Sequence, residues 1–315
     1  MTCRLPQTAW QFIQLQNPKS TYPALALVIL AFIWGYNWVV MKKVLAFCGP
    51  FDFAALRTFF GALCLFAVLA WMKKPLKVVE FKSTLFLGLL QTTLFTALIM
   101  WAVVDGGAGK TAVLSYTMTF WLLILAWPLL GERIHGMQWL AVALALAGLF
   151  FILQPWHPQG SLASSIIATA GGIVWAVSVI VAKKLRSRVE LDLLSLTAWQ
   201  MLLGSVVLVA VTLYIPQQPI ELTGYFWFAV IYNAVLGTAL AWLLWLYVLQ
   251  RLPAGSAGLG SLMVPVVGVL SAWLELGEQP QQWDIAGMLL IGAALLLLSI
   301  LGLREPKVDP EMAQE

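Results

Sequence analysis

Long apolar stretches that carry few charges are the feature that most constrains this chain. Hydrophobic residues make up 61% of the 315 residues and charged residues only 10%, whereas about 25% are charged in an average soluble domain. The apolar residues gather in blocks of about 20, the length with which an α-helix spans the hydrocarbon core. In lipid, a helix satisfies all its backbone hydrogen bonds within one segment. The sequence therefore predicts an all-α integral membrane protein.

Turn-forming Gly, Pro and Asp residues divide the apolar blocks into ten candidate membrane spans. The first 20 residues lack the apolar core of a signal peptide, so we expect the first span to be retained. The connections are short, and only two tails remain beyond the spans. The predicted spans are 22–41, 53–71, 83–104, 111–130, 136–154, 161–182, 193–214, 224–249, 255–274 and 285–303.

Basic residues indicate how the spans are oriented. Ten spans place both tails on one side, and cytoplasmic segments carry an excess of Lys and Arg. With the tails in the cytoplasm, the outer segments hold only Lys42, Lys43 and Lys110 of the 18 basic residues. The asymmetry predicts a multi-pass protein of the inner (plasma) membrane with cytoplasmic tails at 1–21 and 304–315.

The two halves of the sequence repeat each other. A Trp, a Val and a Lys pair recur at a constant offset in 34–43 and 175–184, and a Gly, a Ser, a Trp and a Gly-Glu pair recur in 109–132 and 255–278. Because each half holds five spans, the second half is inverted relative to the first. The sequence predicts two inverted five-helix repeats, 22–154 and 155–303. Inverted repeats in transporters place the substrate near the membrane midplane, between the repeats.

Short motifs stand in a fixed order along these halves: Trp34-Gly35-Tyr36-Asn37, Phe53 to Arg57, Leu130 to Arg133, Leu252 to Ala257, Val264-Pro265 and Leu276 to Glu278. In this order they resemble the drug/metabolite transporter superfamily, in its EamA-type branch of ten-helix carriers. The resemblance covers about 22–303. It implies transport of small metabolites such as amino acids, usually outward, through a central cavity between the repeats.

One departure from the superfamily bears on mechanism. Its four-helix multidrug exporters rely on a Glu in their first helix. Spans one and six of this chain occupy the equivalent positions and contain no Asp or Glu. This difference counts against exchange of protons for cationic drugs by that route.

Polar and aromatic residues inside the spans are the candidates for a substrate cavity, because polar groups in a membrane are costly and tend to be functional. Two tryptophans equivalent in the repeat are each followed by a polar residue on the same helix face. The alternative is that the hydroxyls bond back to their own helix and that the aromatics pack. The predicted cavity residues are Trp34, Asn37, Gln91, Thr92, Tyr116, Trp175, Ser178, Asn233 and Ser261.

Four further residues are predicted to have structural or gating roles. Arg57 lies near the outer end of span two, where its side chain can snorkel; contact with an anion, or a pair with Asp52 or Asp105, is the alternative. Glu132 and Glu278 match in the repeat and are expected to cap or gate opposite faces. Pro265 is expected to kink span nine.

The sequence favours a secondary carrier over other membrane proteins. A membrane enzyme would need clustered catalytic groups, and the spans contain no His and one firmly charged residue, Arg57. A sensor or channel would need a cofactor lysine or a filter loop, and neither is evident. We therefore expect no enzyme activity, no cofactor, no metal and no nucleic-acid partner. The expected partners are a small-molecule substrate and the bilayer, with the protein a monomer or weak homodimer. Transport would be facilitated, or coupled through a group such as Glu275.

Overall fold

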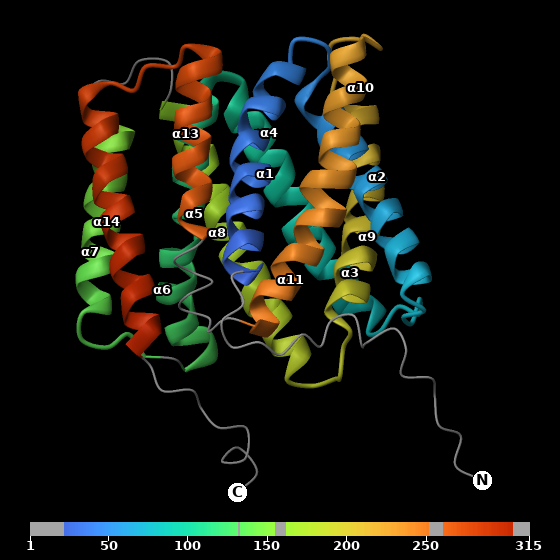
Figure 1. The fold of residues 1–315 in the computed structure, drawn as a ribbon, viewed down its shortest axis with the longest axis horizontal. Helices are drawn as coiled ribbons and strands as arrows, with labels where there is room; N and C mark the ends of the chain where they lie inside the picture. The colour runs from blue at the N-terminus through green and yellow to red at the C-terminus, as the bar shows by residue number, and fades with distance from the viewer. Residues whose placement is uncertain (1–21, 132, 155–161, 252–260, 305–315) are drawn as a thin grey trace, which may run out of the picture.

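The computed structural model describes residues 22–131, 133–154, 162–251 and 261–304. Every regular element in these ranges is a helix. The helices stand side by side, roughly upright in Figure 1, where α1 ends and α2 begins at the upper end of the bundle. We call the opposite end, where α2 ends, the lower end. Backbone groups are thus paired within each helix, as a lipid environment requires.

The elements of the first half run from α1 to α7. A wider, π-helical segment, η2, joins α3 and α4 into one continuous apolar helix, Phe81–Gly106, while α5 and α6 follow each other over Ala108–Leu130. The bounds are α1 (Tyr22–Val44), α2 (Pro50–Trp71), α3 (Phe81–Gly88), η2 (Leu89–Leu94), α4 (Phe95–Gly106), α5 (Ala108–Tyr116), α6 (Met118–Leu130) and α7 (Gln138–Leu153).

The elements of the second half run from α8 to α14. Here too a π-helical segment, η3, lies inside a long helix and joins α10 to α11. The bounds are α8 (Leu162–Arg186), α9 (Leu193–Tyr214), α10 (Gly224–Ile231), η3 (Tyr232–Leu240), α11 (Ala241–Arg251), α13 (Met263–Leu276) and α14 (Gln282–Arg304).

The helices have the length and composition of membrane spans. Eight are long and apolar enough to cross a bilayer, and α7 and α13 are shorter apolar helices. These two correspond to the predicted fifth and ninth spans. The first part of the predicted ninth span, 255–260, lies outside the described residues.

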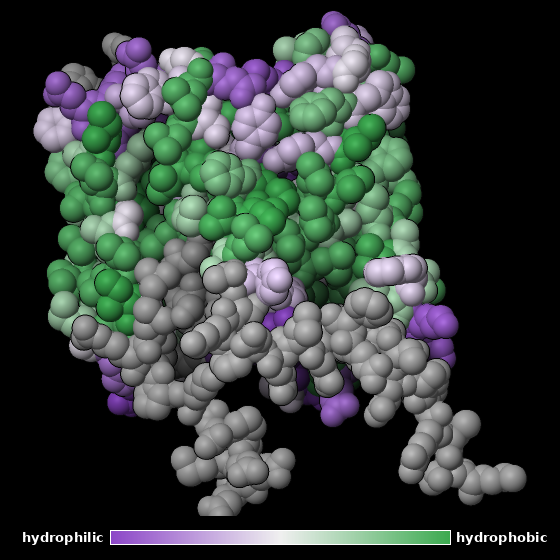
Figure 2. Space-filling view, in the orientation of Figure 1, coloured by the Kyte–Doolittle hydropathy of each residue, from purple (hydrophilic) through white to green (hydrophobic). Residues whose placement is uncertain are grey.

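The surface of the bundle confirms the membrane assignment. Figure 2 shows a hydrophobic band across the middle of one face, with hydrophilic residues gathered toward both ends. Large apolar side chains point outward along the helices; Phe32 is 57% exposed and Leu289 is 69% exposed. A soluble monomer rarely exposes so continuous an apolar surface, whereas lipid tails solvate it.

Helices distant in sequence form the most extensive contacts. α7 packs along α14, α2 along α9, and α1 along α13. The α7–α14 pair stands at one side of the bundle in Figure 1, with α1, α13 and α5 nearer its centre. The two halves of the chain are therefore interleaved, and the middle of the bundle lies between them.

The break near Pro265 lies three residues before the proline, at Leu262, and the predicted kink of span nine stays a prediction. The helix α13 begins at Met263, so Pro265 stands in its first turn. Backbone N–H groups in a first turn have no partner within the helix, and a proline there removes no helical bond.

Candidate functional site

The two π-helical segments lie in the middle of long helices and carry the mid-span amides. η2 contains Gln91 and Thr92, and η3 contains Asn233. A π-turn inserts an extra residue into the α-helical ladder and is frequent at functional sites. Both segments stand at the third helix pass of their half, which makes them the first candidates for a site between the halves.

The η2 segment is held by α9. Thr92 is buried, and its hydroxyl donates to Oε1 of Gln200 at 3.1 Å. The hydroxyl of Thr93 donates to the Gly204 carbonyl at 2.8 Å. Gln91 beside them is half-buried. Gln200, a third amide in this region, was not among the predicted cavity residues.

The η3 segment is held by α1. Nε1 of Trp34 donates to the Gly237 carbonyl at 3.0 Å, and the Tyr232 hydroxyl donates to the Ile33 carbonyl at 2.7 Å. A π-turn leaves carbonyls available for such bonds. Trp34 therefore braces this segment through its indole N–H, and its ring lies 6.2 Å from that of Trp245.

Trp175, the repeat counterpart of Trp34, meets the other π-helical region. Its ring packs on Phe95, the first residue after η2, with centroids 4.7 Å apart. The hydroxyl of Ser178 is fully buried and donates to the carbonyl of Trp175 on its own helix at 2.7 Å. Each tryptophan thus lies against a long helix of the opposite half, while Ser178 satisfies itself locally.

Asn37 and Asn233 differ from the hydroxyls. Asn37 is 6% exposed and Asn233 is fully buried. Nδ2 of Asn233 donates to the Ala229 carbonyl at 3.0 Å, but the Oδ1 atoms of both residues have no hydrogen-bond partner among the described residues. Burying such an oxygen unpaired costs about 1–3 kcal/mol. These amides are the least satisfied polar groups near the two π-helical segments.

The remaining predicted cavity residues lie along α5 and before α13. Tyr116 is half-buried where α5 ends, and it packs on a core cluster shared by α5, α7 and α14. Ser261 is half-buried just before α13. The hydroxyls of Ser115 and Thr117 bond back to carbonyls of their own segment. This stretch therefore contributes the ring of Tyr116, while the hydroxyls of Ser115 and Thr117 are already hydrogen-bonded.

Carboxylates and lysines tie helices together at the upper end. Glu278 accepts from the backbone N–H groups of Ala108 (2.8 Å) and Gly109 (3.0 Å) and so caps α5. Glu275 pairs with Lys43 and accepts from the Tyr36 hydroxyl, joining α13 to α1. Glu132, the residue that matches Glu278 in the repeat, lies outside the described residues.

Arg57 lies within α2 and makes no pair with the acids proposed for it. Its guanidinium Nη1 lies against the sulfur of Met41 on α1. Among the described residues, Lys43, Lys74 and Lys110 form ion pairs with acids, whereas Arg57 forms none with Asp52 or Asp105. The side chain is half-buried rather than extended into solvent.

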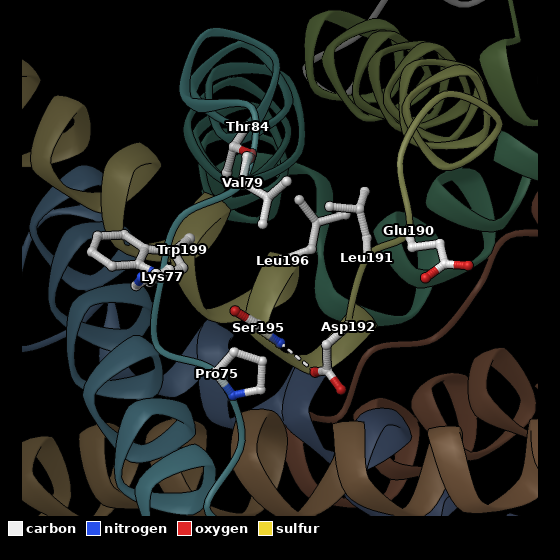
Figure 3. A pocket seen from close by; sticks show the side chains of 10 residues that line it. All are labelled: Pro75, Lys77, Val79, Thr84, Glu190, Leu191, Asp192, Ser195, Leu196 and Trp199. Carbon is white, nitrogen blue, oxygen red and sulfur yellow. Dashed lines mark hydrogen bonds between the residues drawn. The ribbon is translucent and has the colours of Figure 1, made fainter.

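A cavity of about 260 Å³ lies at the lower end, between the loop after α2 and the start of α9. Figure 3 shows Val79, Leu191 and Leu196 around its apolar side, with Asp192 at its rim. The Nε1 atom of Trp199 donates to the Leu76 carbonyl at 3.0 Å. The sequence did not single out this cavity, because no single motif marks it.

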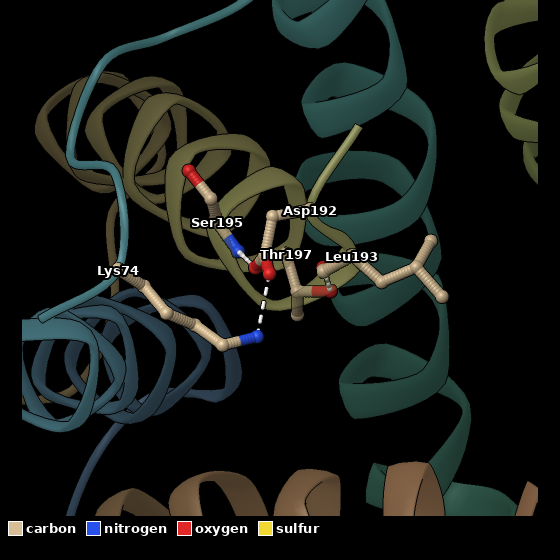
Figure 4. Close-up of polar contacts among 5 residues, drawn as sticks. All are labelled: Lys74, Asp192, Leu193, Ser195 and Thr197. Atoms are coloured by element: carbon tan, nitrogen blue, oxygen red, sulfur yellow. Dashed lines mark hydrogen bonds and ion pairs between the residues drawn. The ribbon is translucent and has the colours of Figure 1, made fainter. Parts of the chain in front are cut away.

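The charges at that rim form a paired cap. Nζ of Lys74 lies 2.5 Å from Oδ2 of Asp192, and Oδ1 of Asp192 accepts from the Ser195 N–H at 2.9 Å at the start of α9 (Figure 4). Burial raises the pKa of the Asp192 carboxyl, but the bonds from Lys74 and Ser195 outweigh it and bring the pKa below its usual value. The aspartate is thus held ionised at neutral pH.

A helical bundle with an apolar girdle and unsatisfied amides in its interior is typical of a multi-pass membrane transporter. Within the described residues there is no group of three or more side chains that could hold a metal ion. The model of the EamA-like transporter family matches residues 21–154 and again 162–300. The chain therefore belongs to the EamA-like transporter family.

Similar proteins carry transporter names. An uncharacterized transporter of Bacillus subtilis strain 168, YoaV, is 27% identical over 87% of this chain and 95% of its own length. Proteins named probable amino-acid metabolite efflux pump are 26% identical in Escherichia coli K12 and 29% identical in Salmonella typhimurium LT2, each over 89% of this chain and 95% of their length.

The fold has a counterpart among solved structures. A crystal structure matches with a TM-score of 0.64 over 91% of this chain and 99% of its own length, at 14% identity. At that identity the likeness concerns the fold alone. The family and the names of its relatives describe transporters rather than enzymes.

Proposed function

We propose that the chain crosses the inner membrane ten times as two inverted five-helix repeats. The α7–α14 contact supports this arrangement because it is reciprocal. A Cβ atom built on Gly148 would lie 2.7 Å from the Gly287 carbonyl oxygen, and one on Gly287 would lie 2.5 Å from the Gly148 carbonyl oxygen. Ile291 flanks the first glycine and Ile152 the second. Such exchange of equivalent contacts is what a two-fold axis between the repeats produces.

The α2–α9 pair supports the same arrangement. At the lower end, Lys74 in the loop after α2 pairs with Asp192 at the start of α9. At the upper end, Gln217 in the loop after α9 accepts from the N–H groups of Phe51 and Asp52 at the start of α2. Each helix start is therefore held by the loop that follows the other helix.

The function we propose is secondary transport, with export of amino acids or related metabolites by alternating access. The observation that carries it is the pair of π-helical segments, one in each half, each braced by an aromatic residue of the other half. A segment with loosened α-helical bonding between two rigid halves suits a midplane binding site. The names of two relatives, both probable amino-acid metabolite efflux pumps, support the substrate class.

The contacts at the upper end support a conformation that is closed there. Ties between α1 and α13, and between α5 and the loop before α14, join helices there. The lower end holds the cavity of about 260 Å³ and a second one of about 370 Å³ between α3 and α8. The basic residues near this end support a cytoplasmic position for it, and we propose that substrate enters from there.

The test is to overproduce the protein in bacterial cells and to profile metabolites in the medium, beside a Trp34→Ala/Trp175→Ala variant of equal membrane abundance. We expect one class of amino acids to rise with the intact protein and to rise several-fold less with the variant, since both π-helical braces are lost. An unchanged medium with the intact protein would refute export. Ser205→Ala is a matched control because its buried hydroxyl only bonds the Leu202 carbonyl of its own helix.

A further inference from the structure

The observation behind this inference is that Asn37 and Asn233 have buried amide oxygens without a partner in the described part of the chain. The orientation of the Asn233 amide is set, because its Nδ2 is committed to the Ala229 carbonyl. The large majority of buried side-chain polar atoms in proteins have a hydrogen-bond partner. These two oxygens are among five buried side-chain atoms without a partner in the described part of the chain, and each could accept from a donor outside it.

Contacts between α1 and η3 place the two amides at one level of the bundle. Trp34 bonds Gly237, and Leu27, further down α1, packs against Val248, further down the other helix. The two helices therefore run antiparallel. Toward the upper end, Asn37 lies three residues after Trp34 on α1, and Asn233 lies four residues before Gly237 on η3. Asn37 and Asn233 are therefore at about the same level of the bundle.

The helix α2 brings Arg57 to the same level. Ala54 shares a core cluster with Ala229 and Val230, and Gly61 lies against Thr238. The two helices therefore run parallel, as Figure 1 also shows. Arg57, between these two contacts, comes level with residues 233 and 234.

The guanidinium of Arg57 also faces α1, where it touches Met41, one turn above Asn37. Thioether sulfur is a weak acceptor, whereas a guanidinium carries five N–H donors. No carboxylate among the described residues pairs with Arg57. One level of the bundle thus holds the Arg57 guanidinium, which has N–H donors without an oxygen acceptor. It also holds two amide oxygens to which no described group donates.

We propose that Arg57, Asn37 and Asn233 form the headgroup site for an α-amino acid. Arg57 donates to the substrate carboxylate, and the two Oδ1 atoms accept from its ammonium group. A carboxylate has only acceptors and an ammonium only donors, so the zwitterion satisfies all three side chains together. A simple carboxylate would leave the amide oxygens unpaired, and a cationic amine would approach Arg57 with like charge. This assignment rests on the proposed transport function and replaces the structural role that the sequence favoured for Arg57.

The experiment uses the purified protein in proteoliposomes and measures exchange of radiolabelled leucine and phenylalanine. Three forms of each compound compete: the amino acid, its amide without a carboxylate, and the corresponding acid without the amine. The wild type should prefer the intact amino acid over both others by about tenfold or more, the size of a lost charge-assisted hydrogen bond.

Each variant should lose one part of that preference. Arg57→Gln should weaken competition by the amino acid about tenfold or more while leaving the amide unchanged. Asn37→Leu and Asn233→Leu should weaken the amino acid and leave the deaminated acid unchanged. Ser205→Ala should match the wild type. If Arg57→Gln does not yield folded protein, Arg57→Lys takes its place. A lysine ammonium cannot donate two parallel hydrogen bonds to a carboxylate as a guanidinium does. Arg57→Lys should therefore cut the preference for the amino acid over its amide several-fold.

The outcomes separate the two proposals. Exchange by the wild type with an undiminished headgroup preference in folded Arg57 variants would overturn the site and leave transport standing. Absence of exchange of either amino acid by the wild type would overturn the amino-acid substrate class, and this site with it. A loss of preference in Arg57 variants and in both Asn variants would establish the site.

Discussion

Individual polar residues in the bundle differ in whether their own helix can satisfy them. A hydroxyl such as that of Ser178 donates to a carbonyl one turn back and needs nothing else. An amide such as that of Asn233 can place its NH₂ in the same way, but its oxygen finds no free N–H within a helix, since those are already bonded. Carboxamides in the spans are therefore better indicators of a site than hydroxyls.

At the lower end, the charged residues Asp192 and Lys74 satisfy each other and the start of α9. Asp192 caps α9 and pairs with Lys74, and both side chains are about a quarter exposed. Asp192→Asn keeps a capping oxygen but removes the ion pair, so it should cost about 1 kcal/mol or less in stability. Asp192→Ala also removes the cap and should cost about 1 kcal/mol more. Thermal unfolding in detergent checks the order; equal losses would show that the cap contributes nothing.

The pH dependence of that pair has a definite sign. Because the folded pKa of Asp192 is lowered, its contribution is complete above the unfolded value of about 3.9 and is lost as pH falls from there through the folded pKa. The difference in stability between the wild type and Asp192→Asn should therefore be constant near neutral pH and shrink below about pH 4. A difference that grows on acidification would contradict the assignment.

At the scale of elements, the helices meet where side chains are smallest. Gly148 and Gly287 let the backbones of α7 and α14 approach until a methyl group no longer fits. In a membrane the hydrophobic effect does not drive helices together, because lipid tails are as apolar as the side chains. Small residues at such crossings instead allow close van der Waals packing. The pair forms one side of the bundle and takes no part in the polar level around Arg57.

Gly148→Ala should therefore destabilise the protein. The added methyl would meet the Gly287 carbonyl oxygen at 2.7 Å, and overpacking of this kind costs about 1–3 kcal/mol. Gly292→Ala on α14 is the matched control, because nothing lies within 4 Å of the added atom. It should be neutral or gain up to about 1 kcal/mol from helix propensity. Equal melting temperatures for the two variants would refute the close contact.

For the whole molecule, the proposed inverted arrangement assigns each loop to a side of the membrane. The loop after α2 and the loop after α9 hold the starts of the opposite helices at the two ends of the bundle. Lys77 in the first loop and Pro219 in the second are exposed. The basic residues near the lower end predict that Lys77 lies on the cytoplasmic side and Pro219 on the outer side.

Cysteine labelling in intact cells tests that assignment. In a background without Cys3, Cys48 and Cys64, Pro219→Cys should react with a membrane-impermeant maleimide added outside. Lys77→Cys should react only after the cells are permeabilised. Reaction of both positions from outside would contradict the topology, and the reverse pattern would invert the chain and place the cavities of the lower end outside.

The sequence by itself determined the helical membrane class, the positions of the main apolar helices and the family, because each rests on local composition, spacing or motif order. The lower-end cavity, the pairing of Asp192 with Lys74 and the close approach of α7 to α14 were decided only by tertiary structure. They join residues more than 100 positions apart, and no single helix carries their signal. The position of Arg57 shows the difference most clearly. Its charge is visible in the sequence, but its level with two amide oxygens that lack a partner among the described residues arises only when three helices pack together.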